Sequence, residues 1–189
     1  LDAEKNPLTM TAHYPSGMES HTFSTDENGC FILPEKLPVG TYYFREITAP
    51  EGYLLNEELL KFKVKEGHDW QEPVEVEFED EPAMEKIRLK KTDAESGKGL
   101  EGVYFDIIAK TDIVTPDGTL RMKAGEKAGT MVTGTDGTAG SEELFPGTYE
   151  IVETKQAAGY MLPLSPYEVQ VEYREGKGVE VMIENNRSS

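Results

Sequence analysis

Apolar and polar residues alternate with a period of two along most of the chain. Tyr167, Val169 and Val171 are separated by single polar residues, and Phe62 and Val64 lie between lysines. This period is typical of strands that bury one face and expose the other to water. We find no convincing amphipathic helical period. The pattern therefore predicts an all-β protein.

Turn-forming residues separate these alternating stretches. Examples are Asp136-Gly137, the Pro-Asp-Gly run at 116–118 and the Glu-Gly-Lys-Gly run at 175–178. Glycine beside aspartate or proline favours a tight reversal of the chain. Many short strands joined by such turns are typical of antiparallel β-sandwiches.

One block of sequence occurs twice. Residues 40–46 read GTYYFRE and residues 147–153 read GTYEIVE, and a Gly-Tyr pair follows each block, at 52–53 and at 159–160. A repeat without insertions indicates one structural unit used twice. We predict two tandem β-sandwich domains, at residues 1–81 and 82–189, that meet near Glu81-Pro82-Ala83.

The net charge of the chain limits the classes of molecule that it is expected to bind. The 189 residues include 19 Lys and Arg against 36 Asp and Glu, a formal net charge of −17. This charge repels phosphate backbones and anionic lipid headgroups, so we expect no nucleic-acid partner. No apolar run approaches the roughly 20 residues of a membrane-spanning helix. We expect no membrane insertion in this fragment, and any signal peptide or sorting signal to lie outside it.

Residues for metal or redox chemistry are sparse. Cys30 is the only cysteine, so it has no partner for an internal disulfide or a zinc site, and we expect it to be a buried spectator. His13, His21 and His68 are scattered in polar or turn-like sequence, as ordinary surface residues are. We find no phosphate loop or nucleophile elbow. The sequence predicts no metal, no cofactor and no multiple-turnover enzyme.

Three polar side chains in the second domain face the predicted core. Strand parity directs Lys91, Glu153 and Asn185 inward, because each continues the apolar face of a predicted strand. Those apolar faces consist of Ile87 and Leu89, of Tyr149 and Ile151, and of Val179, Val181 and Ile183, respectively.

Parity alone leaves two interpretations open. In the first, Lys91 extends past the sheet edge and pairs with Glu153, while Asn185 caps a strand end. In the second, burial favours the neutral amine of Lys91, and a protonated Glu153 polarises the Asn185 carboxamide. Attack by the amine would then release ammonia and leave an isopeptide cross-link, in a reaction that occurs once.

The second domain resembles a known family. It carries Lys91-Thr92-Asp93, GVYF at 102–105, TDG at 135–137, LFPGTY at 144–149, then Glu153, Gly159-Tyr160 and Asn185. This series resembles the collagen-binding-adhesin B-type (CnaB) domain, also called SpaA-type or prealbumin-like, of Gram-positive surface proteins and pilins. The resemblance implies an Ig-like, prealbumin-like sandwich in which Lys91 is the amine donor, Asn185 the acceptor and Glu153 the catalytic acid. It favours the cross-link over the ion pair.

Two details qualify the match. Residues 156–158 read Gln-Ala-Ala and lack the proline that the family carries after the catalytic strand. Asn186 would become the acceptor only if a bulge reversed the parity of the last strand.

The first domain resembles the same family but departs at its ends. Glu46 and Asp80, which ends a predicted strand from Val74, are possible counterparts of Glu153 and Asn185. The aligned lysine would precede Leu1, and Lys5 is expected in a turn beyond the first strand. We expect this domain to be truncated at its first strand. Its exposed sheet edge is interpreted first as a result of truncation and second as a strand-binding groove.

Together, these features predict extracellular stalk or shaft modules of a cell-wall-anchored adhesin or pilus protein, with neighbouring domains of the same protein as partners. The alternative is recognition of a host matrix protein or glycan through the insertion at 111–133, which otherwise is an extra hairpin over a sheet edge. Trp70 would then stack on sugars, or else cap the end of a core. Residues 14–17 (YPSG) resemble a pilin polymerisation motif but have no lysine.

Overall fold

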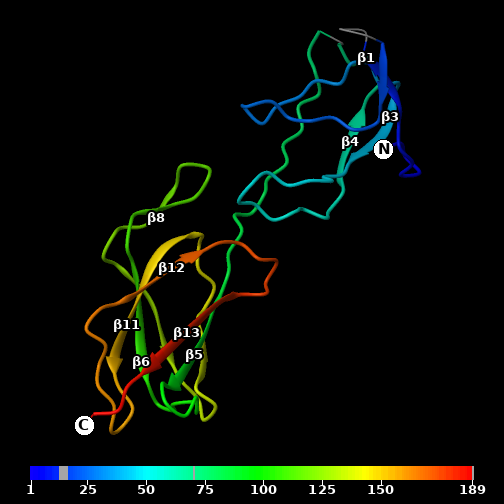
Figure 1. The fold of residues 1–189 in the computed structure, drawn as a ribbon. Helices are drawn as coiled ribbons and strands as arrows, with labels where there is room; N and C mark the ends of the chain where they lie inside the picture. Colours follow the sequence, from blue (N-terminus) through cyan, green and yellow to red (C-terminus); the bar gives the residue numbers. More distant parts are fainter. Residues whose placement is uncertain (13–16, 70, 189) are drawn as a thin grey trace. The chain divides into compact units, whose positions relative to one another are not determined.

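The computed structural model describes residues 1–12, 17–69 and 71–188, and those ranges form strands and turns (Figure 1). The chain divides into two compact units. Unit 1 comprises Leu1–Ala49 and Leu55–Asp80, and unit 2 comprises Pro50–Leu54 and Glu81–Ser189. The all-β class predicted from the alternation is confirmed.

The described part of unit 1 contains two antiparallel strand pairs. β1 (Met10–Ala12) pairs with β2 (Met18–Ser20), and β3 (Gly40–Phe44) pairs with β4 (Leu60–Val64). Aromatic rings pack across the second pair. The Phe62 ring lies 5.7 Å from the Tyr42 ring and 4.8 Å from the Phe44 ring, centroid to centroid. These stacked rings hold β3 and β4 together by burying large apolar surfaces.

The strand predicted over residues 74–80 is wrong. None of these residues pairs with a neighbouring strand, and Val74 is exposed. A strand persists only where a neighbour satisfies its backbone groups. At the start of unit 1, the residues near Asp2 form a turn, in which the Lys5 N–H donates to the Asp2 carbonyl at 3.0 Å.

The expectation of a buried Cys30 is also wrong, since this residue is exposed. The Cys30 N–H donates to Asp26 Oδ1 at 3.0 Å, as the Asn28 N–H does at 2.9 Å. A short aspartate side chain that accepts from the following amides closes a turn. Cys30 therefore lies at a surface turn and not in a core.

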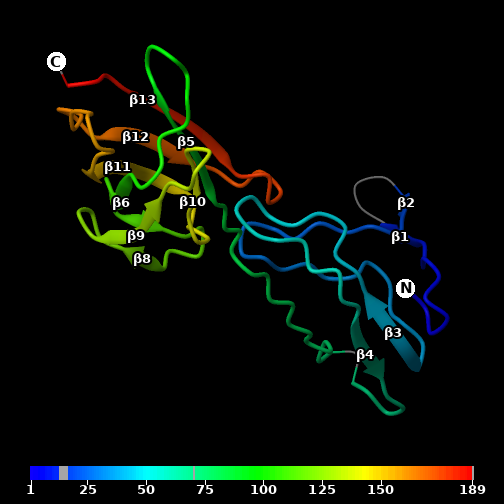
Figure 2. The same ribbon diagram turned by 90° about the horizontal axis from the view of Figure 1, so that it is seen from below.

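Unit 2 contains a three-stranded sheet in the order β10–β5–β13 and a four-stranded sheet in the order β12–β11–β6–β9 (Figure 2). A separate pair, β7 and β8, forms a hairpin. The strands are β5 (Ile87–Asp93), β6 (Tyr104–Ala109), β7 (Ile113–Val114), β8 (Leu120–Met122), β9 (Lys127–Val132), β10 (Thr138–Gly140), β11 (Gly147–Lys155), β12 (Tyr167–Val171) and β13 (Val179–Asn185).

The core of unit 2 draws on both sheets. The smaller sheet contributes alternate apolar residues of β5 and β13, and the larger sheet contributes those of β6, β9, β11 and β12. The buried set includes Ile87, Leu89, Val179 and Val181 on one side, and Phe105, Ile107, Met131, Tyr149, Ile151, Val169 and Val171 on the other. Two sheets that bury alternate residues against each other form a sandwich.

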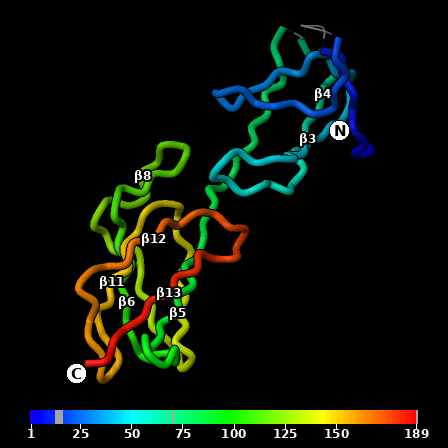
Figure 3. The backbone as a smooth tube through the Cα atoms, in the orientation of Figure 1, coloured from blue at the N-terminus to red at the C-terminus, as the bar shows by residue number. Residues whose placement is uncertain are grey.

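The first and last strands of unit 2 lie side by side (Figures 1 and 3). β5 and β13 pair in parallel, in a register that runs from Ile87 opposite Val179 to Asp93 opposite Asn185. The other strand pairs in the described residues are antiparallel. In this register Lys91 lies opposite Ile183. Side chains alternate between the two faces of a sheet, and Asn185 follows Ile183 by two residues. Lys91 and Asn185 therefore lie on the same face.

The sequence repeat corresponds to a repeated local structure. The Tyr42 hydroxyl donates to the Pro38 carbonyl at 2.7 Å, and the Tyr149 hydroxyl donates to the Phe145 carbonyl at 2.7 Å. Burial raises the pKa of Tyr149 to about 12. Each tyrosine thus satisfies its hydroxyl with the turn that precedes its own strand.

Gly137 lies against the backbone of Lys91. Its φ is +79°, and a Cβ atom at this position would lie 2.3 Å from the Lys91 carbonyl oxygen. We expect Gly137→Ala to lower the free energy of unfolding of unit 2 by about 3 kcal/mol or more, because the left-handed backbone and the clash both oppose the methyl group.

Gly118→Ala is the matched control for this substitution. Gly118 has a φ of +82°, but a Cβ atom added there would have no neighbouring atom within 4 Å. Only the backbone cost of about 1 kcal/mol should remain. Chemical denaturation of both variants measures the difference, and equal losses would show that the contact with Lys91 is unimportant.

Candidate functional site

Three strands of unit 2 carry the predicted site residues into its interior. Lys91 lies on β5, Glu153 on β11 and Asn185 at the end of β13. Lys91 is 0% exposed, Asn185 is 4% exposed, and the Glu153 side chain is 2% exposed. The structure therefore brings together, away from water, an amine, a carboxyl group and a carboxamide.

Each of these side chains contacts the other two. The Lys91 Nζ lies 3.0 Å from Glu153 Oε2 and donates to Asn185 Oδ1 at 2.5 Å. The Asn185 Nδ2 donates to Glu153 Oε1 at 2.9 Å and to Glu153 Oε2 at 3.1 Å. The carboxyl group thus bridges the amine and the amide nitrogen.

Burial lowers the pKa of Lys91. The hydrogen bond to Glu153 and the negative charge of that residue oppose the shift but do not reverse it. The Phe105 ring, whose centroid lies 5.8 Å from Nζ, contributes to the apolar surroundings. A lowered pKa increases the fraction of neutral amine, which is the nucleophilic form of lysine.

The carboxamide of Asn185 is held from further directions. Its Nδ2 also donates to the Met161 carbonyl at 3.2 Å, and the backbone carbonyl of Asn185 accepts from the Ala94 N–H at 3.0 Å. β13 keeps its register through Asn185, so Asn186 is exposed. Asn185 is therefore the asparagine that faces Lys91.

Sequence reasoning missed a polar cluster next to these residues. Asp93 is 1% exposed, and its Oδ2 accepts from the Tyr160 hydroxyl at 2.6 Å and from Arg187 Nε at 2.9 Å. Its Oδ1 accepts from the Ser96 N–H at 2.7 Å. The Tyr160 hydroxyl, with Ser96 and Arg187, holds the pKa of Asp93 well below its usual range. Lys-x-Asp and Gly-Tyr were visible as motifs, but nothing in the sequence joined them.

A second buried carboxyl group was missed as well. Glu85 is 1% exposed and accepts from four backbone N–H groups, between 2.7 and 3.1 Å away. Burial alone raises the pKa of a carboxyl group, but these four donors hold the pKa of Glu85 below its ordinary value. The donors belong to Lys86, Arg174, Gly176 and Gly178. Glu85 thus fastens the entry of β5 to the turn before β13.

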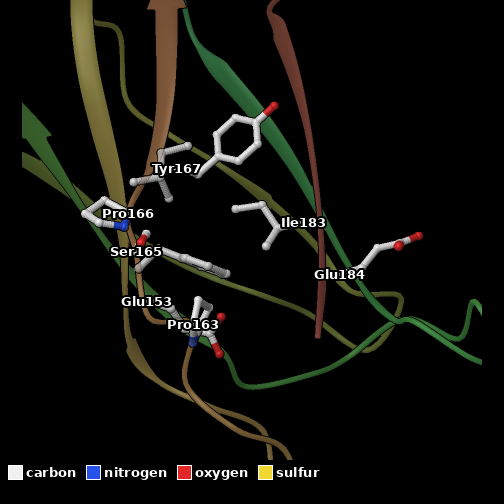
Figure 4. Close-up of a pocket in the computed structure, with 9 residues that line it drawn as sticks. Glu153, Pro163, Ser165, Pro166, Tyr167, Ile183 and Glu184 are labelled. Atoms are coloured by element: carbon white, nitrogen blue, oxygen red, sulfur yellow. The ribbon is translucent and has the colours of Figure 1, made fainter. Parts of the chain in front are cut away.

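A pocket of about 180 Å³ adjoins Glu153 (Figure 4). Glu153 and Pro163 lie together at one end, and the carboxyl group of Glu184 points away from them (Figure 4). The other lining residues are Phe105, Ile151, Ser165, Pro166, Tyr167 and Ile183. This pocket has room for molecules of the size of water or ammonia beside the carboxyl group of Glu153.

The candidate residues of unit 1 have different partners. Glu46 Oε2 accepts from the Asn56 N–H at 2.7 Å. Asp80 Oδ1 is buried and has no hydrogen-bond partner among the residues that the structure describes. Lys5 lies in a turn, as expected, and its Nζ is 5.7 Å from the centroid of the Tyr43 ring.

Within the insertion at 111–133, β7 and β8 form a hairpin, whereas β9 is an edge strand of the four-stranded sheet. Ile113 belongs to the core, and the Arg121 guanidinium lies 4.9 Å from the centroid of the Phe145 ring. Val114 and Leu120 are exposed. The β7–β8 part of the insertion matches the interpretation as an extra hairpin, whereas β9 belongs to the sheet itself. Ligand recognition by the insertion stays a prediction. Trp70, His13 and residues 14–16 lie outside the described residues, and His21 and His68 are exposed.

Within residues 1–12, 17–69 and 71–188, no three His, Cys, Asp or Glu side chains gather in a way that could hold a metal ion. The same ranges contain no helix with the length and apolar character needed to cross a membrane.

Comparison with solved structures finds several that are similar to this chain. The Bacillus anthracis TIE protein has a TM-score of 0.61 and 23% identity, over 86% of this chain and 28% of that one. The major pilin SpaD from Corynebacterium diphtheriae has a TM-score of 0.46 and 20% identity, over 61% of this chain and 32% of that one. BcpA, the major pilin subunit of Bacillus cereus, has a TM-score of 0.43 and 24% identity, over 57% of this chain and 31% of that one. The chain thus spans about a third or less of each.

A search of curated proteins finds no match. One family model matches this chain twice, once over each half that contains the repeated block. The prealbumin-like fold domain called SpaA matches residues 4–81 and again residues 85–187. The chain therefore belongs to the SpaA prealbumin-like fold domain family, with two tandem copies of the domain.

Proposed function

We propose that this chain is a structural stalk or shaft segment of an extracellular, cell-wall-anchored adhesin or pilus protein, and that an isopeptide bond between Lys91 and Asn185 locks its second domain. The observation that carries the proposal is the buried contact of an amine with both a carboxamide and a carboxyl group. An isolated buried ion pair seldom stabilises a fold, because desolvation offsets the attraction. Cross-linking converts the buried Lys91 ammonium into a neutral amide.

The bond would form by transfer of the acyl group of Asn185. A proton moves from the Lys91 ammonium to Glu153 Oε2, 3.0 Å away, and leaves a neutral amine. The amine attacks Cγ of Asn185, and the bond from Cγ to Nδ2 breaks. Glu153 Oε1, 2.9 Å from Nδ2, passes this proton to the departing nitrogen, and Glu153 then accepts one of the two protons on the attacking nitrogen.

The atoms balance in this scheme. The ammonium and the carboxamide carry five nitrogen-bound hydrogens, of which one stays on the new amide and three leave as ammonia. The fifth stays on Glu153 or leaves with the ammonia as ammonium. The pocket beside Glu153 offers the ammonia a place to go. Glu153 is regenerated or left neutral, and the reaction occurs once per chain.

The placement of this bond suits a protein under tension. β5 and β13 are neighbouring parallel strands, so opposite pulls on the two ends of unit 2 would shear them apart. A bond from Lys91 to Asn185 carries the force across and bypasses the chain between them, a separation of 94 residues. The sandwich would then stay folded while the segment transmits force.

The domains at 1–81 and 82–189 would differ in this respect. We propose that Glu46 and Asp80 are the counterparts of Glu153 and Asn185, and that Lys5, which lies over the Tyr43 ring, is not the amine donor of this domain. The chain should accordingly form one cross-link.

Intact mass spectrometry of the denatured chain tests this function. The native chain should be lighter than its sequence mass by about 17 Da, the mass of one ammonia. Lys91→Ala, Glu153→Ala and Asn185→Ala should each restore the full mass, because each removes one participant. A deficit that persists in Glu153→Ala would exclude its role as the proton carrier.

Neighbouring residues give matched controls for these variants. Lys90→Ala and Asn186→Ala change the same residue types at exposed positions. Both should keep the deficit of about 17 Da, since neither side chain reaches the site. A native chain of full mass would contradict the proposal, and a deficit of about 35 Da would indicate a second bond formed with loss of water in unit 1.

A further inference from the structure

We propose that Asp93, Tyr160 and Arg187 are positioning residues that set how fast Lys91 joins to Asn185. This inference rests on the proposed cross-link. None of the three contributes a reacting atom, yet each lies within two residues of a group that touches the reacting amide. Their common contact is one carboxylate oxygen, Asp93 Oδ2, which accepts from the Tyr160 hydroxyl at 2.6 Å and from Arg187 Nε at 2.9 Å.

That oxygen connects the two segments that the reaction must hold together. Asp93 follows Lys91 by two residues on β5, and Arg187 follows Asn185 by two residues after β13. The hydrogen bond from Arg187 to Asp93 therefore closes the strand pair just beyond the reacting side chains. Without it, the end of β13 is held by fewer contacts, and terminal strand residues are the first to fray.

The Tyr160 hydroxyl ties a third segment to the same oxygen. Tyr160 precedes Met161, whose carbonyl accepts from Asn185 Nδ2 at 3.2 Å. The same loop pairs with the residues that follow β13. The Ser188 N–H donates to the Gly159 carbonyl at 2.9 Å, and the backbones of Tyr160 and Arg187 form an antiparallel β-bridge. The loop position thus controls one of the contacts that orient the carboxamide.

Orientation of the carboxamide matters for the reaction. In the structure, Oδ1 faces the amine and Nδ2 faces Glu153 and Met161, so the leaving nitrogen lies next to the proton carrier. A carboxamide that rotates freely spends less time in this arrangement. Small displacements of reacting groups from a near-attack geometry reduce rates strongly.

The motif alone does not create this cluster. Asp2 begins the same Asp-Ala-Glu run in unit 1 that Asp93 begins in unit 2. It accepts instead from the Asn6 N–H at 2.8 Å and from the Asn6 side chain at 3.3 Å. In unit 2, by contrast, the aspartate is 1% exposed and gathers two side chains from distant parts of the sequence. The hydrogen-bond partners of Asp93 therefore depend on the tertiary structure around the site in unit 2, and not on the local sequence alone.

Tyr160→Phe tests the inference, because it removes one hydroxyl and keeps the ring. The full chain is synthesised by cell-free translation, samples are quenched in guanidinium at intervals, and the lighter fraction is measured by intact mass. We expect cross-linking to become about tenfold to a hundredfold slower than in the native chain. Arg187→Met, which keeps an apolar stem, should slow it in the same direction. Tyr173→Phe makes the same chemical change at an exposed tyrosine and should leave the rate unchanged.

A second control separates positioning from stability. Glu85→Gln weakens unit 2 at the entry of β5, away from the reacting groups, and the unfolding temperature of each variant is measured in a Lys91→Met background. If Tyr160→Phe slows cross-linking and Glu85→Gln does not, although both lower the unfolding temperature, the inference holds. Equal slowing by both, or a native rate in Tyr160→Phe, would overturn it. A native chain that never becomes lighter would overturn the proposed cross-link itself, and the positioning role with it.

Discussion

A chain that carries Lys91→Met together with Glu153→Gln should keep its full mass, and its second unit should unfold about 20 °C below that of the native chain. The proposed bond closes a loop across 94 residues of separation. Closing such a loop removes entropy from the unfolded chain equivalent to about 4 to 5 kcal/mol. Differential scanning calorimetry measures the shift directly.

The double variant is designed to lose the bond without leaving a buried charge. Methionine is an unbranched, uncharged side chain one atom shorter than lysine. The amide of the introduced glutamine can pair with the Asn185 carboxamide, which already contacts both Glu153 oxygens. The single variant Lys91→Met leaves a carboxylate without its cation. It should be less stable than the double variant by about 3 to 5 kcal/mol.

These two variants distinguish the cross-link from a simple ion pair. With an ion pair alone, the double variant should unfold within a few degrees of the native chain, because apolar or neutral replacements of buried pairs are often neutral. That result would contradict the cross-link even if the single variant were strongly destabilised.

The second large effect is expected from Glu85→Ala. Four backbone N–H groups that now donate to one carboxyl group would lose their acceptor at once. Hydrogen bonds to a charged group contribute about 1.5 to 3 kcal/mol each, although losses within one cluster are not additive. We expect unit 2 to lose about 4 kcal/mol or more, measured by chemical denaturation. Glu175→Ala, at an exposed position of the same turn, should have little effect.

Glu85 also predicts how stability depends on pH. Its pKa in the folded state lies below its ordinary value of 4.5. A carboxyl group with a depressed folded pKa contributes stability above its unfolded pKa and loses it as the pH falls through the folded pKa. The native chain should therefore lose stability as the pH falls below about 4.5, and Asp93 adds a loss of the same sign below 3.8.

Glu85→Gln tests this assignment, because glutamine does not titrate. The slope of unfolding free energy against pH should be shallower in Glu85→Gln than in the native chain. An unchanged slope would show that the acid loss arises elsewhere.

Much of the fold was readable in the sequence. The alternation of Ile87, Leu89 and Lys91 placed all three on one face, and the structure buries each of them. This succeeds because a strand has a period of two regardless of its neighbours, so a buried face shows in the order of residues. The same reasoning failed for residues 74–80, since alternation cannot show whether a neighbouring strand is there to pair with.

Parity predicted the candidate site more fully than its surroundings. It directed Lys91, Glu153 and Asn185 inward, and the structure brings them into contact. It gave no sign that Asp93 joins Tyr160 and Arg187, or that Glu85 binds a distant turn. Those contacts connect residues separated by 67, 94 and up to 93 positions, respectively.

The amino-acid order by itself determined that this is an all-β chain with a repeated unit, and which polar side chains point away from water. Only the tertiary structure decided that β5 and β13 lie in parallel register, and hence which inward-facing groups meet. The physical reason is that side-chain direction follows from local backbone geometry, whereas distance between strands depends on how the sheets pack. Chemistry between an amine and a carboxamide requires both.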